Sequence, residues 1–107
     1  MNEQPNSPFD NDDLNGGEYR LRLYVTGATP NSARAIVNLK EFCEIHLKDK
    51  YELEIIDVYQ QPLSAEADQV IAIPMLIKLA PLPQRRLIGD MSDREKIFRG
   101  LNLAAGD

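Results

Sequence analysis

The feature that most constrains this chain is a pair of short apolar runs within residues 70–89. The first run, at 75–79, follows Pro74, and the second, at 85–89, follows a turn that contains two prolines. Two runs of strand length that are joined by a short turn and closed by glycine predict a β-hairpin. Pro74 directly precedes the first strand, where its missing N–H costs nothing.

The segment before the hairpin carries two alternating patterns and one helical pattern. In residues 19–26 the side chains alternate, with Leu21, Leu23 and Val25 on one face and Arg20, Arg22 and Tyr24 on the other. Apolar side chains then recur at helical spacing over residues 35–47, and residues 51–58 alternate again. A strand, a long helix and a strand in this order predict a βαβ unit with parallel strands.

The start of each main helix is predicted from its capping residues. The long helix begins either at Thr29, with Pro30 in the first helical position, or one turn later at Ser32. Ser92 and Glu95 have the spacing of a capping box, which predicts the start of the final helix.

The order of these elements predicts an α/β fold. A short helix at 62–70 lies between the second strand and the hairpin, and the final helix extends from 92 to about 105. The resulting order, β-α-β-α-β-β-α, predicts a thioredoxin-like arrangement with a four-stranded mixed sheet and three helices. In that fold a cis proline opens the third strand, which accounts for the position of Pro74.

Charge divides the 107-residue chain into two parts. Residues 1–18 contain five of the 17 acidic residues and no Lys or Arg, so residues 19–107 hold 12 acidic and 12 basic residues. We expect a disordered acidic arm at 1–18, because it has little to bury, and one folded domain at 19–107. A neutral domain with an acidic arm argues against nucleic-acid binding. No apolar run is long enough to span a membrane, and a cytoplasmic location is expected.

The chain lacks the residues that a thioredoxin-like enzyme needs. Such enzymes place a reactive cysteine at the start of the first helix, and this chain has Thr29, Pro30, Asn31 and Ser32 there. The single cysteine, Cys43, falls in the apolar stripe of the helix, and the single histidine has no metal ligand at suitable spacing. We therefore expect no enzymatic activity, no metal and no cofactor.

Several motifs are similar to one known family. They are the segment from Leu23 to Gly27 with the Thr29–Ser32 turn, the Ile73-Pro74 pair, the Leu82-Pro83 turn, and the consecutive run from Arg85 to Lys96. Together they resemble the KaiB family of circadian clock proteins over residues 20–103. The resemblance implies a non-catalytic regulator that binds the N-terminal ring of KaiC, a hexameric P-loop ATPase. It also implies a sensor histidine kinase and a KaiA-like protein as further partners.

The resemblance also assigns a binding site. In the family the second strand carries much of the KaiC contact, which here implies Tyr51, Glu52, Leu53 and Glu54. Typical clock members have small and basic residues where this chain has the two glutamates. We therefore expect a KaiC-like ATPase of its own as partner, with basic residues opposite Glu52 and Glu54, in circadian-type timing or stress-response signalling.

A further implication of the resemblance is a second fold. KaiB is metamorphic, with a tetrameric ground state that differs in the C-terminal half and a thioredoxin-like monomer that binds KaiC. The residues expected to matter for this balance are Pro74, Gly89, Asp90, Gly100 and Asn102. Gly100 is expected in the middle of the final helix, where glycine costs roughly 1 kcal/mol relative to alanine. Alternatively, Gly100 allows the helix to pack closely on the sheet.

Two other functions remain open on the sequence. One is a thiol-independent or glutathione-binding thioredoxin-like protein, in which Pro74, Asp90 and Ser92 hold an anionic peptide-like ligand near a helix N-terminus. The other is a homo-oligomeric adaptor, a dimer or tetramer, that has no ATPase partner.

Overall fold

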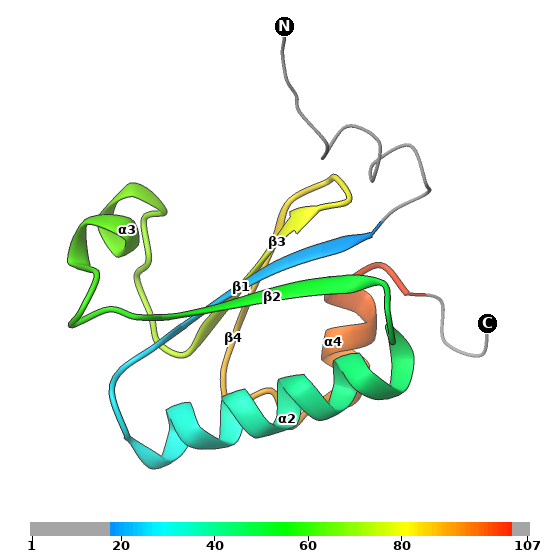
Figure 1. Ribbon diagram of the computed structural model, residues 1–107, viewed down its shortest axis with the longest axis horizontal. Helices are drawn as coiled ribbons and strands as arrows, with labels where there is room; N and C mark the ends of the chain where they lie inside the picture. Colours follow the sequence, from blue (N-terminus) through cyan, green and yellow to red (C-terminus); the bar gives the residue numbers. More distant parts are fainter. Residues whose placement is uncertain (1–17, 104–107) are drawn as a thin grey trace, which may run out of the picture.

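The computed structural model describes residues 18–103, so the predicted acidic arm lies outside the described residues except for Glu18. The elements and their bounds follow the predicted order (Figure 1): β1 Tyr19–Val25, α2 Pro30–His46, β2 Tyr51–Asp57, α3 Pro62–Ala67, β3 Met75–Ala80, β4 Arg85–Ile88 and α4 Arg94–Gly100.

The four strands form one mixed sheet in the order β2-β1-β3-β4. The β1 and β2 strands are parallel, with Leu21 opposite Leu53, and the other two neighbouring pairs are antiparallel. The predicted βαβ unit and hairpin are therefore confirmed. The Ile73–Pro74 peptide bond is cis, as the thioredoxin-like arrangement led us to expect.

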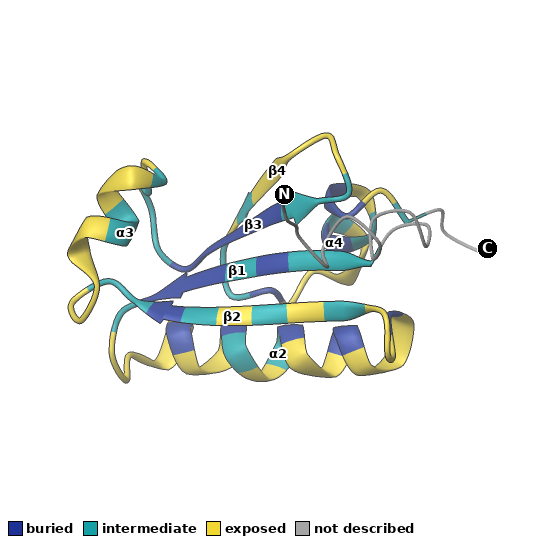
Figure 2. Cartoon of the chain, turned by 45° about the horizontal axis from the view of Figure 1, so that its top comes forward, coloured by how far each residue is buried: buried dark blue, intermediate teal, exposed yellow. Residues whose placement is uncertain are grey.

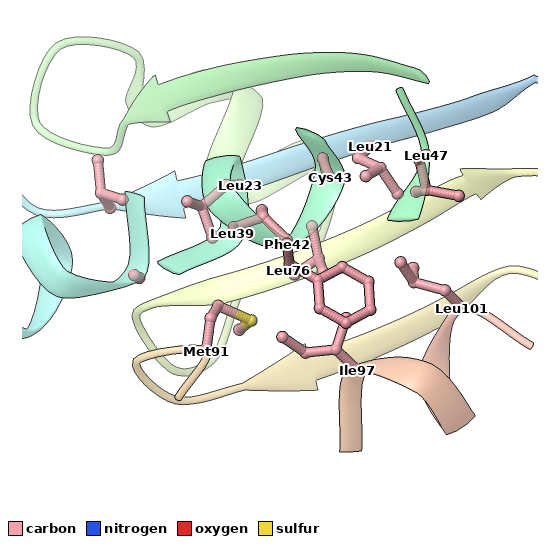
Figure 3. Packing of buried hydrophobic residues seen from close by; sticks show 12 residues of the cluster. Leu21, Leu23, Leu39, Phe42, Cys43, Leu47, Leu76, Met91, Ile97 and Leu101 are labelled. Carbon is pink, nitrogen blue, oxygen red and sulfur yellow. The ribbon is translucent and has the colours of Figure 1, made fainter. Parts of the chain in front are cut away.

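One face of the sheet is covered by α2 and α4 (Figure 2). The main hydrophobic core lies between this face and the two helices (Figure 3), and its best-buried members include Leu23, Leu39, Phe42, Leu76 and Leu101. Phe42 of α2 contacts Phe98 of α4 with ring centroids 5.2 Å apart. This packing holds both helices against the sheet.

The opposite face of the sheet has a smaller core. Tyr24, Ile56, Met75 and Ile77 form it, and residues in and beside α3 pack against them. No residue of α3 itself is fully buried. The α3 helix is therefore attached to the sheet by fewer apolar contacts than α2.

The helix boundaries decide one open prediction and differ from the predictions at two other places. The long helix is capped by Thr29, whose hydroxyl accepts a hydrogen bond from the Ser32 N–H, which decides between the two predicted caps. The final helix is capped by Asp93 rather than Ser92, because the Asp93 carboxylate accepts from the Lys96 N–H at 3.0 Å. The short helix ends at Ala67 instead of continuing to Val70.

Gly100 is the last residue of α4, so the prediction that it lies mid-helix is wrong. Asn102 adopts a left-handed backbone conformation, with φ of 61°, which is favourable for Asn and ends the helix. A Cβ added at Gly100 would lie 2.6 Å from the side-chain carbons of Leu87 in β4. The close-packing alternative therefore describes Gly100 in this fold.

Candidate partner-binding site

The proposed binding residues lie on β2, an outer strand of the sheet that pairs only with β1 among the described strands. Tyr51 and Leu53 point toward the α2 side and contact the main core. Glu52 and Glu54 lie on the other face, and their side chains are 60% and 57% exposed. All four predicted residues are thus brought together at one edge.

The two glutamates do not form a bare negative patch. Each lies opposite an arginine of β1 in the strand register. The Nε of Arg22 is 2.9 Å from Glu54 Oε1, and the Nε of Arg20 is 3.9 Å from Glu52 Oε1. The edge therefore presents two cross-strand ion pairs, and both glutamates already have an arginine partner within the sheet.

Arg22 also reaches α3. Its Nη1 is 2.9 Å from Asp68 Oδ2, and the same oxygen accepts a hydrogen bond from the Tyr24 hydroxyl at 2.5 Å. The Tyr24 hydroxyl lies 3.0 Å from the Ser64 carbonyl oxygen as well. We call Arg22, Glu54, Asp68 and Tyr24 the Arg22 bridge, because they connect the β2 edge to the C-terminal end of α3.

The contacts within the Arg22 bridge favour the charged forms of Arg22 and Asp68. The hydrogen bond to Asp68 is the main reason that the pKa of Arg22 is raised. Burial acts to raise the pKa of Asp68, but the hydrogen bonds from Tyr24 and Arg22 outweigh it and leave that pKa below its ordinary value. Burial, followed by the contact with Asp68, raises the pKa of Tyr24 to about 12. Arg22 and Asp68 thus form a charged pair beside the neutral phenol of Tyr24.

The face beside the β2 edge is hollowed. A groove of about 270 Å³ is lined by both arginine–glutamate pairs and by Leu79. At the start of β2, the Tyr51 hydroxyl donates to Glu44 Oε2 at 2.7 Å, and this hydrogen bond is the main reason that the pKa of Tyr51 is about 12. The edge therefore combines ionic, aromatic and apolar groups.

The residues expected to control the fold balance lie in two places. The N–H of Gly89 donates to the Pro74 carbonyl oxygen at 3.0 Å, which joins the ends of β3 and β4. Asp90 follows, and its pKa is lowered mainly by hydrogen bonds from Ser92. Gly100 and Asn102 lie at the C-terminal end of α4 instead.

The position of a thioredoxin nucleophile holds hydroxyl groups. The Ser32 hydroxyl accepts from the Thr26 N–H at 3.0 Å, and Thr29 caps the helix. Cys43 lies fully buried in the main core, and burial, followed by the charge of Glu44, raises the pKa of its thiol to about 12. Neither place offers a reactive thiolate.

Two residues of the predicted alternative ligand site, Asp90 and Ser92, line a cavity of about 200 Å³ before α4, whereas the third, Pro74, does not line it. Asp90 and Asp93 both line it, together with Lys96. Two carboxylates oppose an anionic ligand, so the geometry does not favour the glutathione-binding alternative. Within residues 18–103, no group of three or more side chains is arranged to hold a metal ion, and no helix is long and apolar enough to cross a membrane.

Sequence reasoning missed two features of this region. Arg22 was assigned to a polar strand face, but Asp68 is 46 residues away and no spacing rule connects them. Lys78 was placed in an apolar run, yet its ammonium is buried on the core side without a hydrogen-bond partner among the described residues. The surroundings of Arg22 and of Lys78 become visible only when the strands are paired in the sheet.

Comparison with known proteins decides the family. The KaiB domain matches residues 22–103. The circadian clock oscillator protein KaiB of Synechococcus elongatus is 51% identical over 89 residues, which cover 83% of this chain and 87% of the relative. The protein of the same name from Prochlorococcus marinus subsp. pastoris is 54% identical over 85 residues, or 79% of each chain. This chain belongs to the KaiB family.

Solved structures agree with this KaiB domain at the level of the fold. The N-terminal domain of Synechococcus elongatus SasA superposes with a TM-score of 0.65 at 24% identity, over 83% of this chain and 88% of that domain. Mitochondrial thioredoxin 3 from Saccharomyces cerevisiae gives 0.65 at 12% identity, over 88% and 87% of the two chains. The fold is therefore thioredoxin-like, and these two similarities carry no further functional information.

Proposed function

We propose that this protein is a non-catalytic regulator that binds a KaiC-like hexameric ATPase. Membership of the KaiB family carries the proposal, since its relatives are clock oscillator proteins. The buried Cys43 and the hydroxyl groups at the start of α2 support a function without thiol chemistry. The setting is circadian-type timing or stress-response signalling in the cytoplasm.

The surface that we propose for the ATPase is the β2 edge around Tyr51, Glu52, Leu53 and Glu54. An outer strand with half-exposed apolar side chains and flanking charges suits a protein partner. Glu52 and Glu54 are the proposed contacts for basic residues of the ATPase. Their pairing with Arg20 and Arg22 means that a partner cation must share these carboxylates or displace the arginines.

The test is calorimetric titration of the purified protein against its cognate KaiC-like ATPase. Glu52→Lys/Glu54→Lys should weaken binding by on the order of a few kcal/mol if the pairs are partly buried. The matched control is Glu41→Lys, an exposed carboxylate on α2 that also pairs with an arginine. If the double variant keeps the wild-type circular dichroism spectrum and binds with unchanged affinity, the interface does not include Glu52 and Glu54.

A second variant separates recognition from folding. Arg20→Glu/Glu52→Lys keeps a cross-strand pair of opposite charges but exchanges their positions. We expect folding stability close to that of the wild type and weaker binding to the ATPase. Competition with a sensor histidine kinase is measured in the same titration, because the family resemblance implies such a kinase as a further partner.

A further inference from the structure

Arg22 contacts two different elements at once, and this arrangement suggests that the two elements are coupled. One guanidinium serves two carboxylates, with its Nε directed to Glu54 and its Nη1 to Asp68, both at 2.9 Å. A planar guanidinium binds a single carboxylate best through two parallel N–H groups. In this structure Glu54 of β2 and Asp68 at the end of α3 each accept one N–H, and the two N–H groups come from different edges of the guanidinium.

The two carboxylates differ in their exposure and in the element to which they belong. Glu54 belongs to the β2 edge and is more than half exposed, whereas the Asp68 side chain is only 23% exposed. Asp68 is the C-terminal cap residue of α3, a helix without a fully buried residue. Polar contacts from Tyr24 and Arg22 therefore carry much of the attachment of α3 to the sheet.

We propose that Arg22 is a positioning residue that couples the β2 edge to α3, because Glu54 and Asp68 compete for its one guanidinium. This inference rests on the proposed function in assigning Glu54 to the partner. A basic residue of the ATPase that engages Glu54 leaves Arg22 free to turn one edge of its guanidinium, with two parallel N–H groups, toward Asp68. Binding at the edge then fastens α3 to the sheet.

The coupling acts in both directions, as thermodynamic linkage requires. Loss of the Asp68 charge leaves Arg22 wholly with Glu54, so Glu54 becomes less available to a partner cation. Asp68 thus increases affinity at an edge that it does not touch. Tyr24 supports the same arrangement by holding the shared Asp68 oxygen.

The first experiment uses the free protein and measures amide hydrogen exchange in α3. Glu54→Gln should slow exchange of the α3 amides by about two- to fivefold, the size expected for a half-exposed ion pair. Glu52→Gln is the matched control, because its arginine partner is Arg20, and it should change nothing in α3. In an Arg22→Lys background, which lacks the planar fork, the effect of Glu54→Gln should disappear.

Exchange in α3 that is unchanged in Glu54→Gln, or equally slowed in Glu52→Gln, overturns the coupling. This readout needs no partner, so it stands even if the proposed function fails. Conversely, an ATPase that does not bind the wild-type protein refutes the proposed function without altering the exchange result.

The second experiment measures affinity for the KaiC-like ATPase. Asp68→Asn should weaken binding about two- to fivefold in the wild-type background and have no effect in Glu54→Gln. Ala65→Gly loosens α3 without changing charge and should weaken affinity clearly less than Asp68→Asn does. An equal loss in Ala65→Gly and Asp68→Asn would show that Asp68 acts only by holding the helix, which contradicts the proposal.

Discussion

Lys78 is the residue whose surroundings least suit its side chain. It is only 1% exposed, and its ammonium has no hydrogen-bond partner within the described part of the chain. Burial lowers the pKa of Lys78, and the nearby charge of Arg85 lowers it further. A buried cation without a partner is costly, so this position disfavours the thioredoxin-like packing.

We therefore expect Lys78→Met to increase the free energy of unfolding by about 1–3 kcal/mol at pH 7. Above the lowered pKa the folded state binds fewer protons than the unfolded state, so wild-type stability rises as pH approaches the ordinary value of 10.5. The advantage of the variant should shrink over that range. Urea unfolding at pH 7 and pH 10 measures both effects.

The exposed Lys48 provides the control, since Lys48→Met should change stability by less than about 0.5 kcal/mol. A gain in Lys78→Met that stays constant with pH would mean that the amine is not responsible.

The surroundings of Cys43 predict that its thiol is unreactive in the folded protein. With a thiol pKa of about 12, Cys43 is protonated at pH 8, and the sulfur is buried as well. We expect no reaction with a thiol reagent until the protein unfolds, and no turnover in an insulin reduction assay. Reductase activity that disappears in Cys43→Ser would refute this expectation.

At the scale of elements, α4 shows how two neighbouring capping signals can be confused. Ser92 has the spacing of a capping box, but Asp93 adopts the extended cap conformation and bonds the Lys96 N–H. The Ser92 N–H is instead turned toward the Asp90 carboxylate at 3.1 Å. The conformation of the loop between β4 and α4 decides which residue caps the helix. That conformation could not be predicted from the local sequence pattern.

Asp93→Ala should consequently destabilise the protein by about 1 kcal/mol, the usual cost of losing an N-cap. Ser92→Ala, one residue earlier, should cost clearly less. Thermal unfolding of both variants measures the difference. A larger loss of stability in Ser92→Ala than in Asp93→Ala would show that Ser92 is the N-cap.

Most of the elements could be predicted because their signals are local. The alternation in β1 and the apolar stripe of α2 follow from single-element periodicity. The contacts that matter at the candidate site are not local. Arg22 meets Asp68 only after β1, β2 and α3 have taken their places, so its role could not be derived from spacing.

At the scale of the whole molecule, the α4–β4 contact bears on the proposed balance between two folds. The proposal that Gly100→Ala shifts the population toward the thioredoxin-like monomer rests on the helix preference of alanine. That preference is roughly 1 kcal/mol in a helix interior and smaller at Gly100, the last residue of α4. The same methyl group would collide with Leu87 at 2.6 Å. The two effects oppose each other in this fold.

We expect Gly100→Ala to be more favourable in a Leu87→Ala background than in the wild type, by about 1 kcal/mol or more, because the collision is then removed. Chemical denaturation of the four proteins in this cycle gives the coupling energy. Size-exclusion profiles and NMR spectra of the same set report the population of the thioredoxin-like form. Additive effects would show that Leu87 does not oppose the substitution.

The hydroxyl of Tyr24 also gives the protein an optical property. The chain has four tyrosines and no tryptophan, so tyrosine dominates its near-ultraviolet spectrum. Tyr24 is fully buried, bound to the Asp68 carboxylate, and resists ionisation to a pKa of about 12. A rearrangement that exposes the phenol and separates it from Asp68 would return its pKa toward the ordinary value near 10 and shift its absorbance in alkaline solution. The protein therefore contains its own label-free reporter for the arrangement of β1 and α3.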